Sequence, residues 1–333
     1  MPNEIINRRF CVAPMLDCTD RHARFFLRQI SLHAVMYTEM VTTGALIHGD
    51  KQRFLDFDPA EHPIALQLGG SESSAMAQCA EFAQEWGYDE VNINVGCPSD
   101  RVQSGSFGAC LMLEPELVAK NVKAMAAAVD IPITVKTRIG VDEQEPRLAL
   151  WSLTEAVANA GCRVLIVHAR KAWLKGLSPK ENRDVPPLDY ELVYELKRAF
   201  PELEIIINGG INTLKQCQQH LQYVDGVMMG REAYANPYIL SEVDAILYGD
   251  QHQLPSREEV LKNYIDYAKQ QLSRGVRMNH LSRHVIGLFH GEPNSRIWRR
   301  YISDHAHLPD AGIQVLEQAL NNWQEANHYQ NVI

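Results

Sequence analysis

Short runs of apolar, β-branched residues alternate with longer segments of helical periodicity along most of the chain. This alternation predicts repeated βα units and a parallel sheet. The expected strands are Phe10 to Met15, Val35 to Val41, Ile64 to Gly70, Val91 to Gly96, Ile133 to Gly140, Arg163 to Arg170, Glu204 to Gly210 and Gly226 to Arg231. Eight such units favour a closed (β/α)8 TIM barrel, for which roughly 250 residues is typical, with a doubly wound open sheet as the alternative.

The pattern changes after residue 248, where Gly249 and Pro255 interrupt it. Ser256 and Glu259 match a capping box, and apolar residues then recur at helical spacing. Further helices are expected over 279–290, 294–304 and 310–326. The sequence therefore predicts a barrel domain over residues 1–248, followed by a small all-α helical bundle over residues 249–333.

Composition narrows the class of protein. Of 333 residues, 46% are hydrophobic and 22% are charged, which is ordinary for a soluble globular protein. No apolar run reaches the roughly 18 residues of a membrane span, and the first residues lack a signal-peptide core, so we expect a cytoplasmic protein without membrane contact. The seven cysteines form no Cys/His spacing typical of a metal site, so no metal is expected. The net charge of −9 argues against a nucleic-acid partner unless positive charge is locally concentrated.

Polar and glycine residues follow the ends of the predicted strands, where TIM barrels place their active sites. They are Pro14, Met15, Gln67, Asn94, Cys97, Lys136, His168, Asn208, Gly209, Gly210, Gly230 and Arg231. The last five follow strands seven and eight, where barrels commonly bind a phosphate through loop amides. A tight turn is the alternative for the Asn-Gly-Gly segment.

A phosphate site beside Gln67, Lys136 and His168 suits flavin mononucleotide (FMN), whose ring needs hydrogen bonds at its pyrimidine edge. The alternatives are a surface lysine and a packed histidine. Cys97 follows a strand in a glycine-containing loop, where it could be a nucleophile, a proton donor or a small buried residue. A neighbouring flavin favours the proton donor.

The segment from Asn94 to Gly108 carries a recognisable motif: Asn-x-Gly-Cys-Pro, with a glycine eleven positions after the cysteine. It resembles the signature of tRNA-dihydrouridine synthases, and the resemblance extends along the whole chain. It implies an FMN site that includes Pro14, Met15 and Leu16 together with the strand-end residues above. One departure is Arg101, where many members carry lysine.

Two segments, Lys175 to Tyr190 and Gly287 to Ser303, look like the A-type subgroup of that family, whose target is uridine at positions 20 and 20a of the tRNA D-loop. The resemblance implies that NADPH, or NADH as the alternative, reduces FMN, and that the uridine is flipped into the rim. Hydride would pass from flavin N5 to C6, and Cys97 would give a proton to C5. Asn94 would help to hold the base. A thiol with the ordinary pKa of about 8.5 is mostly protonated at neutral pH and can act as this acid.

Positive charge is concentrated near the C-terminus despite the acidic total. Arg296, Arg299 and Arg300 are spaced to share one helix face, and their match to the family motif favours tRNA binding over a solvated face. Lys180 and Arg183 are expected to contribute from the barrel rim, and Trp298 is expected in the core.

The protein is expected to be a monomer.

Two rival functions stay open. One rival is a flavin enzyme acting on a free pyrimidine, as in dihydroorotate dehydrogenases, and the other is a non-catalytic tRNA-binding protein. The first leaves the basic helices unexplained, and the second leaves the cysteine loop and flavin residues without a purpose.

Overall fold

The structure is a computed structural model that describes residues 6–99, 105 and 107–330, with only the backbone described at positions 329 and 330. Arg101 lies outside the described residues. The chain forms two compact units. The barrel unit comprises residues 1–19 and 33–230, and the helical unit comprises residues 20–32 and 231–333.

Eight parallel strands close into a ring in the barrel unit. Their order is β2-β1-β9-β8-β7-β6-β5-β4, and pairing of β2 with β4 completes the circle. The strands are β1 (Phe10–Val12), β2 (Val35–Tyr37), β4 (Ile64–Gly69), β5 (Glu90–Val95), β6 (Ile133–Arg138), β7 (Val164–His168), β8 (Glu204–Asn208) and β9 (Gly226–Met229). The predicted closed barrel is therefore confirmed. A short additional strand, β3 (Val41–Thr42), pairs with β4 and was not separated from β2 in the prediction.

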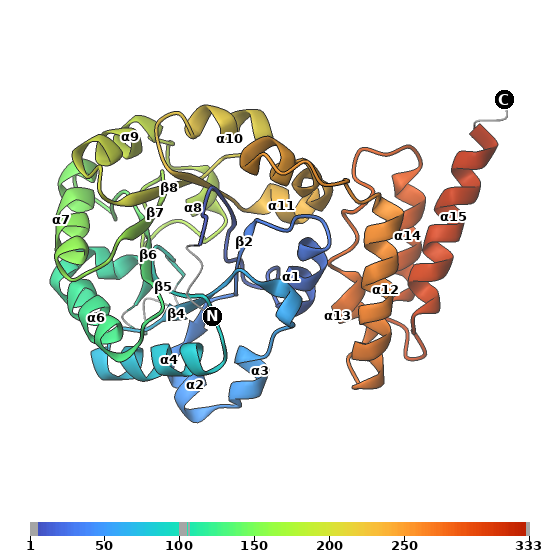
Figure 1. Cartoon of the computed structure of the whole chain (residues 1–333), viewed down its shortest axis with the longest axis horizontal. Coiled ribbons are helices and arrows are strands. Elements are labelled where there is room, and N and C mark those ends of the chain that lie inside the picture. Colours follow the sequence, from blue (N-terminus) through green and yellow to red (C-terminus); the bar gives the residue numbers. More distant parts are fainter. Residues whose placement is uncertain (1–5, 100–104, 106, 331–333) are drawn as a thin grey trace. The chain divides into compact units, whose positions relative to one another are not determined.

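Helices surround these strands, as Figure 1 shows for α4, α6, α7, α9 and α10. The long ones are α4 (Ser73–Glu85), α6 (Pro115–Ala128), α7 (Pro146–Asn159), α9 (Tyr190–Ala199) and α10 (Leu214–His220). The shorter ones are α2 (Thr43–His48), α3 (Lys51–Leu55), η1 (Pro59–Glu61), η2 (Gly108–Leu113) and α8 (Glu181–Asp184). Side-chain caps start several of them: Glu72 caps α4, Glu145 caps α7, and Thr213 with Gln216 forms a capping box on α10.

The interior of the barrel is apolar on one side and polar on the other. A buried apolar cluster joins side chains from six of the strands: Cys11, Ala13, Val35, Tyr37, Ala65, Val164, Ile166, Ile206 and Met228. The inward positions of β5 and β6 instead include Glu90, Asn92 and Thr134, each 0% exposed. Burying these polar groups is tolerable only because they hydrogen-bond to one another.

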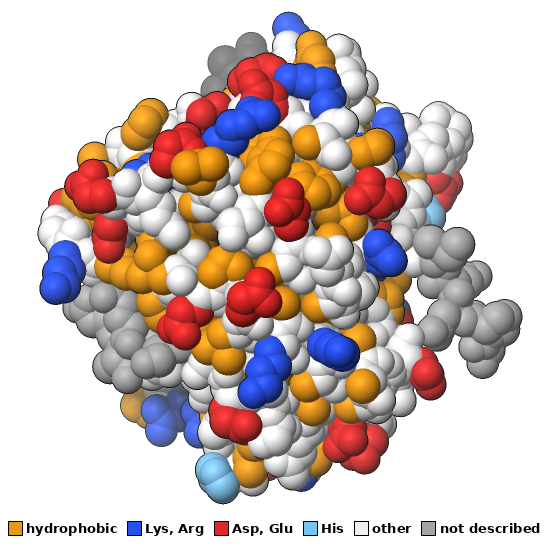
Figure 2. Space-filling view, turned by 90° about the vertical axis from the view of Figure 1, so that its left-hand side faces the viewer, with side chains coloured by type: hydrophobic (Ala, Val, Ile, Leu, Met, Phe, Trp, Pro, Cys, Tyr) orange, Lys and Arg blue, Asp and Glu red, His pale blue; other side chains and the backbone are white. Residues whose placement is uncertain are grey.

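The outer face over α6 and α7 has mixed character. In Figure 2, acidic and basic side chains are interspersed there with apolar ones. This face therefore does not present the single-signed surface that phosphate binding requires.

The helical unit contains the predicted C-terminal helices. Its elements are α1 (Arg21–Arg28), α11 (Arg231–Ala235), η3 (Pro237–Glu242), the π-helical turn η4 (Asp244–Tyr248), α12 (Arg257–Ser273), α13 (Met278–Ser282), α14 (Ser295–His305) and α15 (Gln314–Gln330). The capping box of Ser256 and Glu259 is present at the start of α12. Helix α1 belongs here because Phe25 stacks on Tyr267 of α12, with ring centroids 3.9 Å apart. The domain boundary at residue 248 stays a prediction.

The expected helix over 279–290 is wrong beyond Ser282. The chain there forms successive tight turns, in which amides bond to carbonyls three residues earlier, as Val285 does to Ser282 and Leu288 to Val285. The main chain at Gly287 packs so closely on Ala235 that a Cβ there would lie 2.5 Å from the Ala235 carbonyl oxygen. Sequence periodicity does not report such contacts between distant backbone segments.

Candidate active site

The parallel register brings the predicted site residues to one end of the barrel. Asn94 of β5 pairs with Lys136 of β6, and His168 of β7 pairs with Arg138 on one side and Asn208 on the other. Gln67 of β4 reaches Asn94 through a hydrogen bond of 2.9 Å. The structure thus places these side chains around the carboxyl-terminal rim, where TIM barrels carry out chemistry.

Lys136 is the rim residue whose charge state is most altered. Its Nζ donates to Oδ1 of Asn208 at 3.2 Å, and Asn208 in turn donates to the Met228 carbonyl at 2.8 Å. Burial, followed by the charge of Arg138, lowers the pKa of Lys136 from its usual value to about 7, with Cys97 acting in the opposite direction. An anionic group bound beside this lysine would stabilise its charged form.

The glycine pair after β8 has backbone angles suited to a ligand-binding turn. Gly209 has φ of 112° and Gly210 has φ of 69°, both in the region that side chains disfavour. A Cβ at Gly210 would lie 2.7 Å from Leu188, and one at Gly209 would lie 3.3 Å from the His168 ring. The main chain here therefore approaches its surroundings more closely than another residue would allow.

The remaining predicted cofactor residues lie after β1 and β9. The Met15 sulfur is 3.7 Å from the Cβ position of Gly230, so these two loops are neighbours. Pro14 is partly exposed, and Leu16 is 71% exposed. Arg231 is exposed and begins α11 in the helical unit, so its phosphate-binding role stays a prediction.

Cys97 is partly exposed in the loop that follows β5. Oδ1 of Asn94 accepts hydrogen bonds from the amides of Gly96 and Cys97 at 3.0 and 2.9 Å. The Cys97 carbonyl accepts from the amide of Ala109 at 2.9 Å, and the Cys97 thiol lies 3.5 Å from Oγ of Ser99. Backbone bonds on both sides of the cysteine thus hold its main chain at the rim.

Arg138 is a buried rim residue that the sequence reasoning missed. It donates to the carbonyls of Gly96, Lys171 and Asn182 at 3.3, 3.1 and 2.8 Å. Burial is the main cause that lowers the pKa of Arg138 to about 10; Cys97 opposes this shift, and the charges of Arg170 and Arg183 add to it. The signal for it was its position two residues after Lys136, since alternate residues of a strand share a face.

The predicted RNA-contacting residues fall into two sets, one in each unit. Lys180 and Arg183 are exposed at α8 of the barrel unit. Arg296, Arg299 and Arg300 are exposed on α14 of the helical unit, while Trp298 is fully buried. Arg300 lies 3.5 Å from Asp304, which offsets part of its charge.

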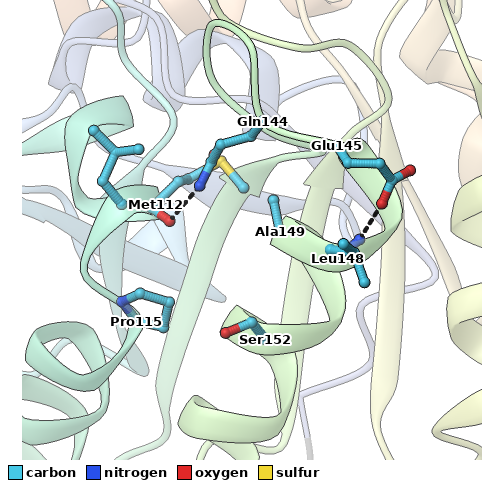
Figure 3. Close-up of a pocket in the computed structure, with 8 residues that line it drawn as sticks. Met112, Pro115, Gln144, Glu145, Leu148, Ala149 and Ser152 are labelled. Atoms are coloured by element: carbon cyan, nitrogen blue, oxygen red, sulfur yellow. Dashed lines mark hydrogen bonds between the residues drawn. The ribbon is translucent and has the colours of Figure 1, made fainter.

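A separate pocket of about 310 Å³ lies among η2 and the first turns of α6 and α7, outside the strands (Figure 3). In the wall of this pocket, the Gln144 side chain donates to the Met112 carbonyl at 3.3 Å, and the Glu145 carboxylate accepts from the Leu148 amide. None of the residues that line it belongs to the predicted site. We therefore place the chemistry at the rim, where the titratable groups converge.

Comparison with known proteins decides the family. A model of the family described as dihydrouridine synthase matches residues 11–324. The chain belongs to the dihydrouridine synthase family. Enzymes of this family in general depend on a flavin. The predicted family resemblance is confirmed.

Curated relatives of the family are similar along nearly the full length. A tRNA-dihydrouridine(20/20a) synthase of Shewanella oneidensis is 57% identical over 319 residues, which covers 96% of this chain and 95% of that protein. Proteins of the same name from Synechocystis and Vibrio cholerae are each 55% identical and cover 93% and 94% of this chain and 92% and 95% of their own lengths.

Neither a membrane-spanning helix nor a metal-binding cluster is found among the described residues. No described helix is both long and apolar enough to cross a membrane. Among the same residues, no cluster of three or more His, Cys, Asp or Glu side chains is arranged to hold a metal ion.

Proposed function

We propose that this protein reduces the C5–C6 double bond of uridine to 5,6-dihydrouridine at positions 20 and 20a of the tRNA D-loop, using FMN that NADPH reduces. Identity of 54–57% with enzymes named for this reaction, along nearly the whole chain, supports the substrate. The observation that carries the chemistry is the convergence of Cys97, Lys136 and Asn208 on one barrel rim.

The residues at the rim fit FMN in their chemistry. A Cβ at Gly209 or Gly210 would lie 3.1 or 2.7 Å from Leu188, so glycine at both positions lets the main chain follow the turn whose amides would bind the phosphate. Lys136 would hold the electron-rich edge of the ring, with His168 on the neighbouring strand β7 and Gln67 two strands away on β4 as further contacts. When bound, FMN supplies the hydride that reduces C6 of the pyrimidine.

Cys97 would deliver the proton to C5 of uracil. The Asn94 side chain and the Ala109 amide both hydrogen-bond to the main chain of Cys97. The backbone from which the thiol extends is therefore held in one position at the rim. A general acid must lie within hydrogen-bond reach of the atom it protonates, which makes such positioning part of the chemistry.

Each unit offers exposed positive charge for tRNA. Lys180 and Arg183 would contact phosphates from the barrel unit, and Arg296, Arg299 and Arg300 from the helical unit. Such contacts position the RNA without reading its sequence. A tRNA substrate would place the enzyme in the cytoplasm.

The deciding experiment uses tRNA that lacks dihydrouridine. Purified protein with FMN and NADPH should convert uridine at positions 20 and 20a, mapped by nucleotide, and should not act on free uridine. Reduction of free pyrimidines instead would favour the dihydroorotate dehydrogenase-like rival. Binding of tRNA without any reduction by flavin-loaded protein would favour the non-catalytic rival.

A further inference from the structure

A continuous series of buried polar side chains lies inside the barrel. It begins at Glu90, whose carboxylate accepts from Arg8 Nε at 2.6 Å, from the Tyr37 hydroxyl at 2.8 Å and from the Thr134 hydroxyl at 2.6 Å. Glu90 is the first residue of β5 and is 0% exposed. The series therefore starts at the amino-terminal end of a strand whose other end leads to Cys97.

The series continues along β5 and its two neighbouring strands. Thr134 Oγ1 accepts from Asn92 Nδ2 at 2.9 Å, and Asn92 Oδ1 accepts from Gln67 Nε2 at 2.8 Å. Gln67 Oε1 accepts from Asn94 Nδ2 at 2.9 Å. Asn94 Oδ1 then accepts from the amides of Gly96 and Cys97.

The direction of every bond follows from the two ends. A carboxylate can only accept, so the Thr134 hydroxyl donates to Glu90 and receives from Asn92. The backbone amide of Cys97 can only donate, so Asn94 must present its oxygen to it. If any side-chain amide between these ends were reversed, two oxygens or two N–H groups would face each other in a buried site, which costs free energy.

Two donors to Glu90, Arg8 and Tyr37, are kept in their protonated forms. Burial alone would lower the pKa of Arg8, but the charges of Glu90 and Glu204 raise that pKa above its usual value. Burial, followed by the charge of Glu90, raises the pKa of Tyr37 well above its usual value, so its hydroxyl remains a donor. These groups fix the starting direction of the series.

We propose that Thr134, Asn92 and Gln67 are positioning residues for the Cys97 thiol, acting through this one-directional series of hydrogen bonds to orient Asn94 and hold the cysteine main chain. The inference rests on the proposed function for the role of the thiol as proton donor. Each Gln67 amide atom keeps a second hydrogen-bonding position, so contact with a cofactor remains open to it.

The primary test is Thr134→Val, which keeps the shape of the side chain and removes the hydroxyl that links Glu90 to Asn92. In the FMN-loaded protein, we expect the rate of uridine reduction to fall roughly 10- to 100-fold, since misplacement by about 1 Å can cost about 100-fold. The rate of FMN reduction by NADPH should be unchanged. Thr134→Ser should restore uridine reduction because it keeps the hydroxyl.

A second readout does not require turnover. Iodoacetamide labelling, mapped by peptide, should modify Cys97 of Thr134→Val about fivefold faster than in the wild-type protein, because loss of one buried hydrogen bond loosens the loop by about that factor. Cys18, which is also partly exposed, provides an internal reference in the same sample. The matched control is Thr154→Val, since Thr154 is equally buried but its hydroxyl donates to the Leu150 carbonyl of its own helix.

The proposal would be overturned if Thr134→Val showed the wild-type rate of Cys97 labelling and the wild-type rate of uridine reduction. If Thr134→Val does not fold, Asn92→Asp provides the same test, because it preserves the shape and removes the donor to Thr134. Failure of the proposed function has a different signature, because the wild-type protein would then not reduce uridine in tRNA, and failure of the proposed thiol role would show as normal uridine reduction by Cys97→Ala. In both cases the labelling would still report whether the series holds the main chain at Cys97.

Discussion

Lys136 donates a hydrogen bond from Nζ to Oδ1 of Asn208 at 3.2 Å, spanning from β6 to β8 across the intervening strand β7. The bond joins two of the predicted cofactor residues that are 72 positions apart in sequence. It places an ammonium group with a pKa of about 7 beside the turn that begins at Gly209.

The pH dependence of stability should report this lysine. Its pKa is lowered in the folded state, so the unfolded chain binds more protons between about pH 7 and 10.5, and the stability of the flavin-free protein should gain from this group as pH rises through that window. Lys136→Met should remove this contribution and stabilise the flavin-free protein below pH 7 by at least about 1 kcal/mol. Thermal unfolding of both proteins at several pH values checks this, and parallel pH profiles would contradict the burial of the charge.

Flavin retention should respond to the same residue in the opposite direction. Lys136→Met removes the cation that would face the electron-rich edge of the ring, so FMN should dissociate more readily even though the flavin-free protein is more stable. Fluorescence titration with FMN measures the change. Equal FMN affinity in the two proteins would remove Lys136 from the cofactor site.

The glycine turn should be sensitive to a single methyl group. Gly210→Ala places a Cβ 2.7 Å from Leu188 at a φ of 69°, so we expect weaker FMN binding and a loss of about 1–2 kcal/mol in stability. Gly176→Ala is the matched control, because it has a similar φ of 83° with nothing within 4 Å of the added atom. If the two variants bind FMN equally, the turn at Gly210 is not part of the phosphate site.

Cys97→Ala should separate the two half-reactions. The flavin and its reduction by NADPH should be retained, while uridine reduction falls roughly 10²- to 10⁴-fold, the usual contribution of a general acid. Cys18→Ala, at another partly exposed cysteine, is the control for loss of a thiol. Stopped-flow measurement of each half-reaction tests this, and near-normal reduction of tRNA would assign the acid to another group.

The basic face of α14 should contribute to tRNA affinity through charge alone. Replacing Arg296, Arg299 and Arg300 by alanine should flatten the slope of log affinity against log salt by roughly two to three units, at about 0.7–0.9 per phosphate contact. The change should be nearer the lower value because Asp304 already offsets part of the Arg300 charge. FMN content and NADPH oxidation should stay unchanged.

A double variant provides the control for removing exposed arginines. Arg147 and Arg198 pair with Glu195 and Glu191, so Arg147→Ala with Arg198→Ala should leave the salt slope unchanged. A wild-type slope in the α14 triple variant would instead direct the search for the RNA site to Lys180 and Arg183.

Local pattern was sufficient to predict the eight strands of the ring and the start of α12, although it missed β3 and placed a helix beyond Ser282. β-Branched runs marked all eight strands of the ring, and the capping box of Ser256 and Glu259 marked the start of α12, because both depend on residues close in sequence. The residues at the strand ends could also be predicted, since a closed barrel brings the ends of its strands together whatever their spacing along the chain.

Tertiary structure decided the properties that depend on distant neighbours. The grouping of α1 with α12 arises from stacking of Phe25 on Tyr267, and two carbonyl partners of Arg138, those of Lys171 and of Asn182 in α8, are 33 and 44 residues away. Strand register set Gln67, Asn92 and Thr134 side by side, and burial lowered the pKa of Lys136. The type of a residue and its neighbours in the sequence determine its chemistry and its local conformation. Its solvation and its hydrogen-bond partners depend instead on which distant segments pack around it.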